Sequence, residues 1–222
     1  MEEEQFLRVS NEEINSKGRS EHTKALSLKF IEKGWSLEGT EIPFEFRFTE
    51  EGQIQEYANL QTPWQKWMES SPSKKEKIQA LQPVVNALKN LHANNIVHRD
   101  IKPANIVVDA NLQGKLIDWD SWYDCENSEE PEFTGTSGFL SEELLENNEG
   151  LKAVDVFALG ITFYVIFQPK TLKHVRAGMF GSEIIQESEQ LEPLDRLILD
   201  MTSQDPLKRP AMAQVANRFQ QL

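Results

Sequence analysis

The chain contains 222 residues, of which 39% are hydrophobic and 27% are charged, and it has a formal net charge of −13. This length provides for one large domain or two small lobes, and the composition is typical of a globular protein rather than a disordered or collagen-like one. No apolar run approaches the roughly 20 residues of a membrane span, and Met1-Glu2-Glu3-Glu4 lacks the cationic start of a signal peptide, so we expect a cytoplasmic protein without membrane contact.

Cysteine content and charge narrow the range of partners. Cys125 is the only cysteine, which excludes an intrachain disulfide and a cysteine-based zinc site. The acidic charge argues against duplex nucleic acid, because phosphate contacts need clustered lysine and arginine. A basic peptide or basic protein partner fits the charge, and so does a surface that is acidic only for solubility.

The first 60 residues carry patterns typical of β-strands. Residues 26–30 and 44–48 alternate apolar and polar side chains, and residues 50–52 supply a turn before residues 53–57. We therefore expect a short antiparallel sheet in this part of the chain.

Residues 61–222 are expected to be mainly helical. Apolar side chains recur at steps of three and four from Ile78 to Leu91, which places them on one face of a core helix. Similar helices are predicted over residues 152–167, 191–202 and 211–220, each bounded by a helix breaker. The first of these is apolar almost all round, as is typical of a helix at the centre of a lobe.

Residues 97–109 read Val-His-Arg-Asp-Ile-Lys-Pro-Ala-Asn-Ile-Val-Val-Asp. This segment resembles the catalytic loop of protein kinases, and its Lys-Pro pair is similar to the serine/threonine branch. Phosphoryl transfer needs a carboxylate that orients the attacking hydroxyl, an amide oxygen that holds magnesium and a cation near the transferred group. The resemblance assigns these three roles to Asp100, Asn105 and Lys102, respectively.

A second motif follows in Ile117-Asp118-Trp119-Asp120, at the end of a β-like run. Its position is similar to that of the kinase Asp-Phe-Gly motif, whose aspartate binds magnesium. Trp119 replaces the phenylalanine and Asp120 replaces the glycine. The resemblance therefore implies a Mg²⁺ or Mn²⁺ site made by Asn105 and Asp118.

Three later residues resemble scaffold positions of the family. Glu143 stands where the glutamate of the Ala-Pro-Glu motif would be, and Arg209 is the expected partner in a buried ion pair. Asp155 resembles the central-helix aspartate that hydrogen-bonds the backbone of the catalytic loop.

The resemblance also implies a nucleotide site near the N-terminus. Lys29, at the end of Leu26-Ser27-Leu28-Lys29, is the candidate for the lysine that grips the α- and β-phosphates of ATP. The backbone groups of Glu56 and Ala58 are the candidates for the hinge that faces adenine.

This part of the chain also departs from the family pattern. The Gly-rich loop is degraded in residues 8–18, and the regulatory helix is missing or reduced in residues 32–42. The implied α+β fold is two-lobed, with a reduced β-rich N-lobe over residues 1–58 and a helical C-lobe over residues 59–222.

The resemblance implies an ATP-dependent serine/threonine protein kinase that phosphorylates hydroxyls of a protein substrate. One alternative is a pseudokinase that binds partners and transfers nothing, which the lost glycines favour. Another is a small-molecule kinase of the aminoglycoside or choline type, which Ile117-Asp118-Trp119 resembles. Activity is favoured because Asp100, Asn105 and Asp118 all remain, and the electrostatic stabilisation that they provide is useless without turnover.

Arg99 suggests how such an enzyme is regulated, because its counterpart in the family meets a phosphate on the activation loop. Between residues 118 and 135 the chain carries six acidic side chains: Asp120, Asp124, Glu126, Glu129, Glu130 and Glu132. Either these residues form a solvated acidic loop, or one of their carboxylates takes the place of the phosphate and pairs with Arg99. Thr136 is expected to hydrogen-bond Asp100 and Lys102, as its counterpart does in the family.

Overall fold

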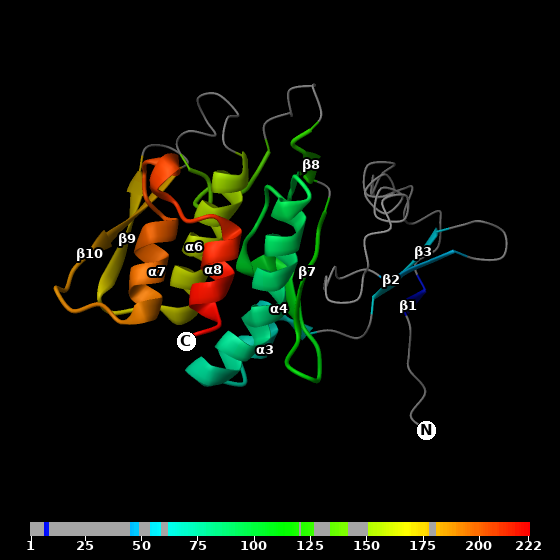
Figure 1. The fold of residues 1–222 in the computed structure, drawn as a ribbon. Helices are drawn as coiled ribbons and strands as arrows, with labels where there is room; N and C mark the ends of the chain where they lie inside the picture. The colour runs from blue at the N-terminus through cyan, green and yellow to red at the C-terminus, as the bar shows by residue number, and fades with distance from the viewer. Residues whose placement is uncertain are drawn as a thin grey trace.

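The computed structural model describes residues 7–8, 45–48, 54–58, 62–119, 121–126, 134–141, 151–177 and 181–222; the first three ranges and residues 176, 177 and 181 are described by their backbone alone. In chain order the elements are β1 (Leu7–Arg8), β2 (Glu45–Phe48), β3 (Ile54–Ala58), β4 (Thr62–Pro63), α3 (Trp64–Met68), α4 (Lys74–Ala93), β5 (Ile96–Val97), η1 (Pro103–Asn105), β6 (Ile106–Val108), β7 (Gly114–Leu116), β8 (Tyr123–Asp124), α6 (Leu151–Phe167), β9 (Leu172–Ala177), β10 (Gly181–Gln186), α7 (Pro193–Met201), η2 (Pro206–Lys208) and α8 (Met212–Phe219). Helices and small antiparallel sheets together make the predicted α+β architecture (Figure 1).

The strands β1, β3 and β2 form a three-stranded antiparallel sheet in that order. The register of β2 and β3 pairs Glu45 with Tyr57 and Phe48 with Ile54. This confirms the two strands predicted at 44–48 and 53–57, whereas the strand predicted at 26–30 lies outside the described residues.

Helix α4 forms where the apolar spacing predicts a helix, and it extends the prediction at both ends. Ser73 starts it with a capping box: its Oγ accepts a hydrogen bond from the backbone N–H of Glu76, and its own N–H donates to the Glu76 carboxylate. The apolar face from Leu81 to Leu91 is buried. Pro83 is also buried, within the helix.

Helix α6 lies at the centre of the helical body, next to α4 and α7 (Figure 1). Its side chains are buried on nearly all sides, as the sequence predicts. Gly160 permits close packing on α7, because a Cβ at this position would lie 2.9 Å from the Cβ of Met201. Helix α8 packs on α4, and its Phe219 ring stacks on Phe163 of α6 at 4.9 Å between centroids.

Two small sheets frame the loop that carries the catalytic-loop motif. Strands β4, β6 and β7 form one antiparallel sheet, and β5 pairs with β8 in the other. Because β5 ends at Val97 and β6 begins at Ile106, these sheets hold both ends of residues 98–105.

The antiparallel hairpin of β9 and β10 is a feature that the sequence analysis did not identify. It follows α6 and precedes α7, and its register runs from Leu172 with Gln186 to Ala177 with Gly181. Leu172, Ser182 and Ile184 are buried on one face of the hairpin.

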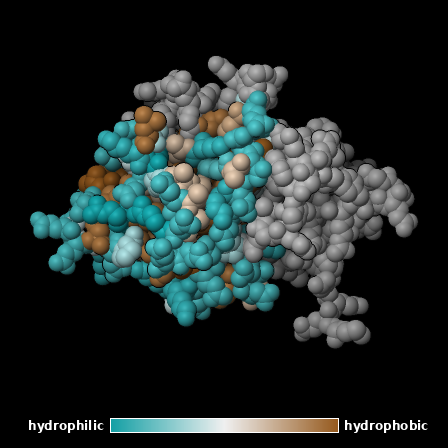
Figure 2. All heavy atoms as spheres, viewed as in Figure 1, coloured by the Kyte–Doolittle hydropathy of each residue, from teal (hydrophilic) through white to brown (hydrophobic). Residues whose placement is uncertain are grey.

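The face shown in Figure 2 is mostly hydrophilic over the described residues, with small apolar areas between polar ones. Among the helices that the structure describes, none is both long enough and apolar enough to cross a membrane.

Candidate active site

Asp155, in α6, binds the backbone of the loop that joins β5 to β6. Its Oδ2 accepts a hydrogen bond from the N–H of His98 and its Oδ1 accepts one from the N–H of Arg99, both at 2.8 Å. The imidazole Nε2 of His92, in α4, lies 3.0 Å from Oδ2. Burial raises the pKa of Asp155, but the hydrogen bond and charge of His92 and the contacts with His98 outweigh burial, so this pKa lies below its ordinary value. The predicted scaffold contact of Asp155 is confirmed.

These hydrogen bonds stabilise an uncommon backbone conformation. Arg99 has φ 66°, in the left-handed region that side chains other than glycine seldom adopt. Such a residue costs on the order of 1–3 kcal/mol and persists only where its surroundings hold it. The N–H of Arg99 is held by Asp155, so α6 fixes the shape of the loop.

His98 is completely buried beside this loop. Its Nδ1 accepts a hydrogen bond from the N–H of Asp100 at 3.2 Å, and its Nε2 lies 3.3 Å from the carbonyl oxygen of Ile117. One acceptor and one donor match the neutral imidazole. Burial lowers the pKa of His98, against the opposing charges of Asp155 and Asp100. The ring packs on Trp119, with centroids 4.4 Å apart, so a tryptophan fills the place next to His98.

Asp100 lies at the centre of a connected set of polar side chains. Lys102 Nζ donates to its Oδ2 at 2.6 Å, and Asn105 Nδ2 donates to the same oxygen at 3.0 Å. The hydroxyl of Thr136 donates to Oδ1 at 2.6 Å and accepts from Lys102 Nζ at 2.7 Å. Both predicted contacts of Thr136 are therefore confirmed.

This set keeps Asp100 ionised. Burial raises the pKa of Asp100, but hydrogen bonds from Lys102, Thr136 and Asn105 and the charge of Lys102 outweigh burial and lower it. The side chains of Asp100 and Lys102 are 13% and 20% exposed, so both remain partly accessible. An ionised carboxylate at this position is suited to orienting a hydroxyl.

Asn105 and Asp118 present oxygens that fit a hard divalent cation. Asn105 is 4% exposed, and its Nδ2 donates both to the carbonyl oxygen and to the carboxylate of Asp100. Its Oδ1 accepts no hydrogen bond from any residue of the described ranges, nor does the exposed carboxylate of Asp118. The N–H of Ile117 donates to the carbonyl oxygen of Asn105 at 2.8 Å, which brings the two segments together. Buried amide oxygen and free carboxylate oxygen are ligands that Mg²⁺ prefers.

The described ranges contain no group of three or more histidine, cysteine, aspartate or glutamate side chains that could hold a metal. A Mg²⁺ site does not need such a group, because Mg²⁺ usually keeps several waters and binds substrate phosphates as well. The Asp118 carboxylate and the Asn105 amide are therefore enough protein ligands for the candidate site. Asp118 has φ 66°, which is a second left-handed residue at this site.

Arg99 connects the loop to the segment that carries Thr136. Its Nε donates to the carbonyl oxygen of Ser121 at 2.8 Å, and its guanidinium lies 5.6 Å from the ring centre of Tyr123. The hydroxyls of Ser121 and Thr134 lie 2.8 Å apart. Most of the acidic residues that are candidates to meet Arg99 lie outside the described residues, so that idea stays a prediction.

Arg209 is buried, as the sequence predicts, and its guanidinium lies 4.7 Å from the ring centre of Phe157. Its Nε donates to the carbonyl oxygen of Ser203 and its Nη1 to that of Ala153. The expected partner, Glu143, lies outside the described residues. The ion pair therefore stays a prediction.

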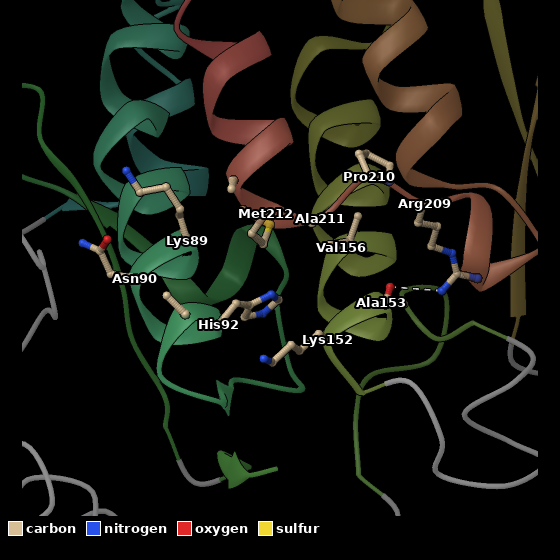
Figure 3. A pocket seen from close by; sticks show the side chains of 12 residues that line it. Lys89, Asn90, His92, Lys152, Ala153, Val156, Arg209, Pro210, Ala211 and Met212 are labelled. Carbon is tan, nitrogen blue, oxygen red and sulfur yellow. Dashed lines mark hydrogen bonds between the residues drawn. The ribbon is translucent and has the colours of Figure 1, made fainter. Parts of the chain in front are cut away.

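A cavity of about 550 Å³ opens where the end of α4 and the start of α6 meet the segment that leads into α8 (Figure 3). Lys89, His92, Lys152 and Met212 are among the residues that line it. Asp100, Lys102, Asn105 and Asp118 are not, so this cavity is separate from the candidate active site.

The predicted nucleotide contacts are not described at the level of side chains. Lys29 lies outside the described residues. Glu56 and Ala58 lie in β3, where Glu56 is paired with Phe46 and Ala58 with Leu7. Their contact with a nucleotide stays a prediction.

The sequence analysis missed the role of His92. Its position one helical turn after Leu88 places His92 on the buried face of α4, and its side chain is 7% exposed. A polar side chain on an apolar helical face indicates a buried partner, but the spacing alone does not identify Asp155, which is 63 residues away.

Comparison with known proteins matches this chain to protein kinases. A family model described as protein kinase domain matches residues 48–219. A protein of Acanthamoeba polyphaga mimivirus named as a serine/threonine-protein kinase is 32% identical over 156 residues, which cover 64% of this chain and 55% of that protein. The liver/testis phosphorylase b kinase gamma catalytic chain of Homo sapiens is 39% identical over 101 residues, which cover 42% of this chain and 25% of that protein. Calcium-dependent protein kinase 31 of Arabidopsis thaliana is 29% identical over 159 residues, which cover 65% of this chain and 33% of that protein. The chain thus spans between about a quarter and about half of these relatives.

Proposed function

This chain belongs to the protein kinase family, and we propose that it transfers the γ-phosphoryl group of ATP to serine or threonine hydroxyls of a protein substrate. The observation that carries the proposal is the set around Asp100, in which Lys102, Thr136 and Asn105 contact one ionised carboxylate. We propose residues 1–58 as a reduced N-lobe and residues 59–222 as the C-lobe that contains this set.

Each side chain of the set has a distinct task. Asp100 accepts a hydrogen bond from the substrate hydroxyl, orients the oxygen toward the γ-phosphorus, and takes the proton as the new P–O bond forms. At the same time the bond from the γ-phosphorus to the bridging oxygen breaks, and ADP is the leaving group. Lys102 keeps Asp100 ionised before transfer and places a positive charge next to the transferred group. Thr136 holds both side chains in one orientation through its hydroxyl.

Asn105 and Asp118 are proposed to hold the metal ion that members of this family use with ATP. A bound Mg²⁺ or Mn²⁺ neutralises negative charge on the β- and γ-phosphates. Asn105 is preorganised for this task, because its Nδ2 is fixed by Asp100 and its Oδ1 accepts no hydrogen bond from the part of the chain that the structure describes. Lys29 is proposed for the α- and β-phosphates, and the backbone of Glu56 and Ala58 for adenine.

A protein substrate with basic character suits this chain, whose formal net charge is −13. The contact of Thr136 with Asp100 and Lys102 supports a protein substrate over a small molecule, because it brings residues 134–141 next to the reacting hydroxyl. Cys125 is a free thiol, which agrees with a cytoplasmic location.

The test is transfer of label from [γ-³²P]ATP to a mixture of basic proteins in the presence of Mg²⁺. We expect phosphoserine or phosphothreonine with the parent protein and a loss of about 10²–10⁴-fold with Asp100→Asn, the range for a lost proton-transfer group. Asp109→Asn is the matched control, because Asp109 caps a turn beyond β6 through its Oδ1. Incorporation that is equal in parent and Asp100→Asn protein contradicts the proposal.

A further inference from the structure

Residues 134–141 form a folded segment that contacts both the catalytic loop and the β9–β10 hairpin. The N–H of Phe139 donates to the carbonyl oxygen of Thr136 at 3.0 Å, and Gly138 has φ 88°. A hydrogen bond from position four to position one with a positive φ at position three is typical of a type II turn. Thr136, whose hydroxyl contacts Asp100, is the first residue of this turn.

The hairpin holds the other end of the turn through one hydroxyl. Ser182, in β10, is 2% exposed, and its Oγ donates to the carbonyl oxygen of Gly138 at 2.6 Å. His174, in β9, lies across the hairpin with its Nε2 2.7 Å from the same Oγ. Two further contacts fix the hairpin, because Gln204 Nε2 donates to the carbonyl oxygen of Ser182 and the N–H of His174 donates to the hydroxyl of Tyr164.

The direction of these hydrogen bonds follows from the number of donors. A serine hydroxyl has one hydrogen, and the hydrogen of Ser182 is directed to Gly138. The contact with His174 therefore requires the Nε2–H of the imidazole to donate. The chain of donors runs from His174 Nε2 to Ser182 Oγ and from there to the carbonyl oxygen of Gly138.

We propose that Ser182, oriented by His174, is a positioning residue that holds the Thr136–Phe139 turn in place for a protein substrate. This inference rests on the proposed function. The turn connects the held carbonyl of Gly138 to the Thr136 hydroxyl, which contacts Asp100 and Lys102. The hairpin thereby fixes the surface next to the reacting hydroxyl.

Among the residues that the structure describes, the space beside Gly138 in which a side chain would lie is open. A Cβ placed on Gly138 would have no other atom within 4 Å among the residues that the structure describes. Two residues of an extended peptide span about 7 Å. Substrate residues that adjoin the acceptor hydroxyl at Asp100 therefore reach the turn, whereas the residues proposed for the nucleotide are others.

The first test needs no activity. Hydrogen exchange of the Phe139 amide reports the turn directly, because that amide donates to Thr136. We expect Ser182→Ala to lower its protection by about tenfold, and Ser182→Thr, which keeps a hydroxyl, to restore most of it. Ser188→Ala is the matched control, because the Ser188 hydroxyl contacts only the exposed bend after β10 among the described residues. Unchanged protection in Ser182→Ala overturns the inference.

The second test separates positioning from general damage. In Ser182→Ala we expect kcat/KM for a peptide substrate to fall about tenfold through a higher KM for the peptide, while KM for ATP stays unchanged. In Ser182→Thr we expect most of the kcat/KM for the peptide to be recovered. A parallel rise in KM for ATP without recovery in Ser182→Thr overturns the positioning role. If the parent protein transfers nothing to protein, the proposed function fails and so does this kinetic claim, while the exchange measurement still decides whether Ser182 holds the turn.

Discussion

Replacing Asp155 by asparagine removes a buried charge that holds the catalytic loop, and its effect on stability follows from the contacts. Asp155 is fully buried and accepts two backbone hydrogen bonds, from His98 and Arg99, besides the contact with His92. An asparagine of the same shape keeps one oxygen but turns an NH₂ group toward a donor. The uncommon φ of Arg99 then loses part of its support.

The magnitude is large for a single substitution. Hydrogen bonds to a charged group contribute about 1.5–3 kcal/mol each, and breaking a buried charged pair costs about 3–5 kcal/mol. We therefore expect Asp155→Asn to lower the free energy of unfolding by about 3–5 kcal/mol. For a protein of this size that corresponds to a fall in Tm of about 6–20 °C.

The assay is thermal and urea unfolding followed by circular dichroism, with Asp200→Asn as the matched control. Asp200, in α7, is 39% exposed and pairs with Arg218 at 2.8 Å. An exposed pair of this kind contributes about 0–1 kcal/mol, so the control is expected to melt close to the parent. If Asp155→Asn melts within about 2 °C of the control, Asp155 does not hold the loop as argued.

Three further predictions concern pH, metal and the second scaffold position. Burial lowers the pKa of His98, so at low pH the unfolded chain binds a proton that the folded chain does not. The free energy of unfolding is therefore expected to fall as pH drops below about 6.5. Thermal unfolding from pH 8 to 5 measures this, and a dependence of stability on pH that is unchanged in His98→Asn contradicts it. ATP is expected to raise Tm more with Mg²⁺ or Mn²⁺ than without, and Asp118→Asn to remove the difference; equal shifts without the metal count against the proposed metal site. Arg209→Ala is expected to cost about 3–5 kcal/mol by stranding its predicted partner Glu143, and a Tm equal to that of the parent rules the pair out.

Local patterns in the sequence predict the helical body well. The spacing of apolar residues predicts α4, and the structure shows the capping box of Ser73 and Glu76 that begins it. The nearly uniform apolar character of residues 152–167 predicts α6 within one residue of its observed start. These elements are predictable because their periodicity and their burial coincide.

The motifs also predict some contacts of the candidate site, because phosphoryl transfer requires particular residue types at fixed spacing. The contacts of Thr136 with Asp100 and Lys102 and of Asp155 with the loop backbone are confirmed. The motifs do not predict the left-handed backbone of Arg99, because that conformation is held by a hydrogen bond that its N–H donates to Asp155, 56 residues away in α6.

The β9–β10 hairpin was not predictable from its own sequence. His174 and Ser182 interrupt the apolar alternation that Leu172 and Ile184 begin, and Ser182 gives no signal of a buried role. Its buried face exists because it packs beside the turn at Gly138 and the helix α7, and such tertiary contacts override weak strand propensity.

The central claim is that the carboxylate of Asp100 directs a serine or threonine hydroxyl to ATP, and single-turnover transfer tests it most directly. A peptide with one serine and its alanine counterpart are mixed with saturating ATP, Mg²⁺ and excess protein, so that differences in binding do not enter the rate. We expect transfer to the serine peptide alone, with a rate about 10²–10⁴-fold lower in Asp100→Asn. A rate that is the same in parent and Asp100→Asn protein, or no transfer by the parent under these conditions, contradicts the claim.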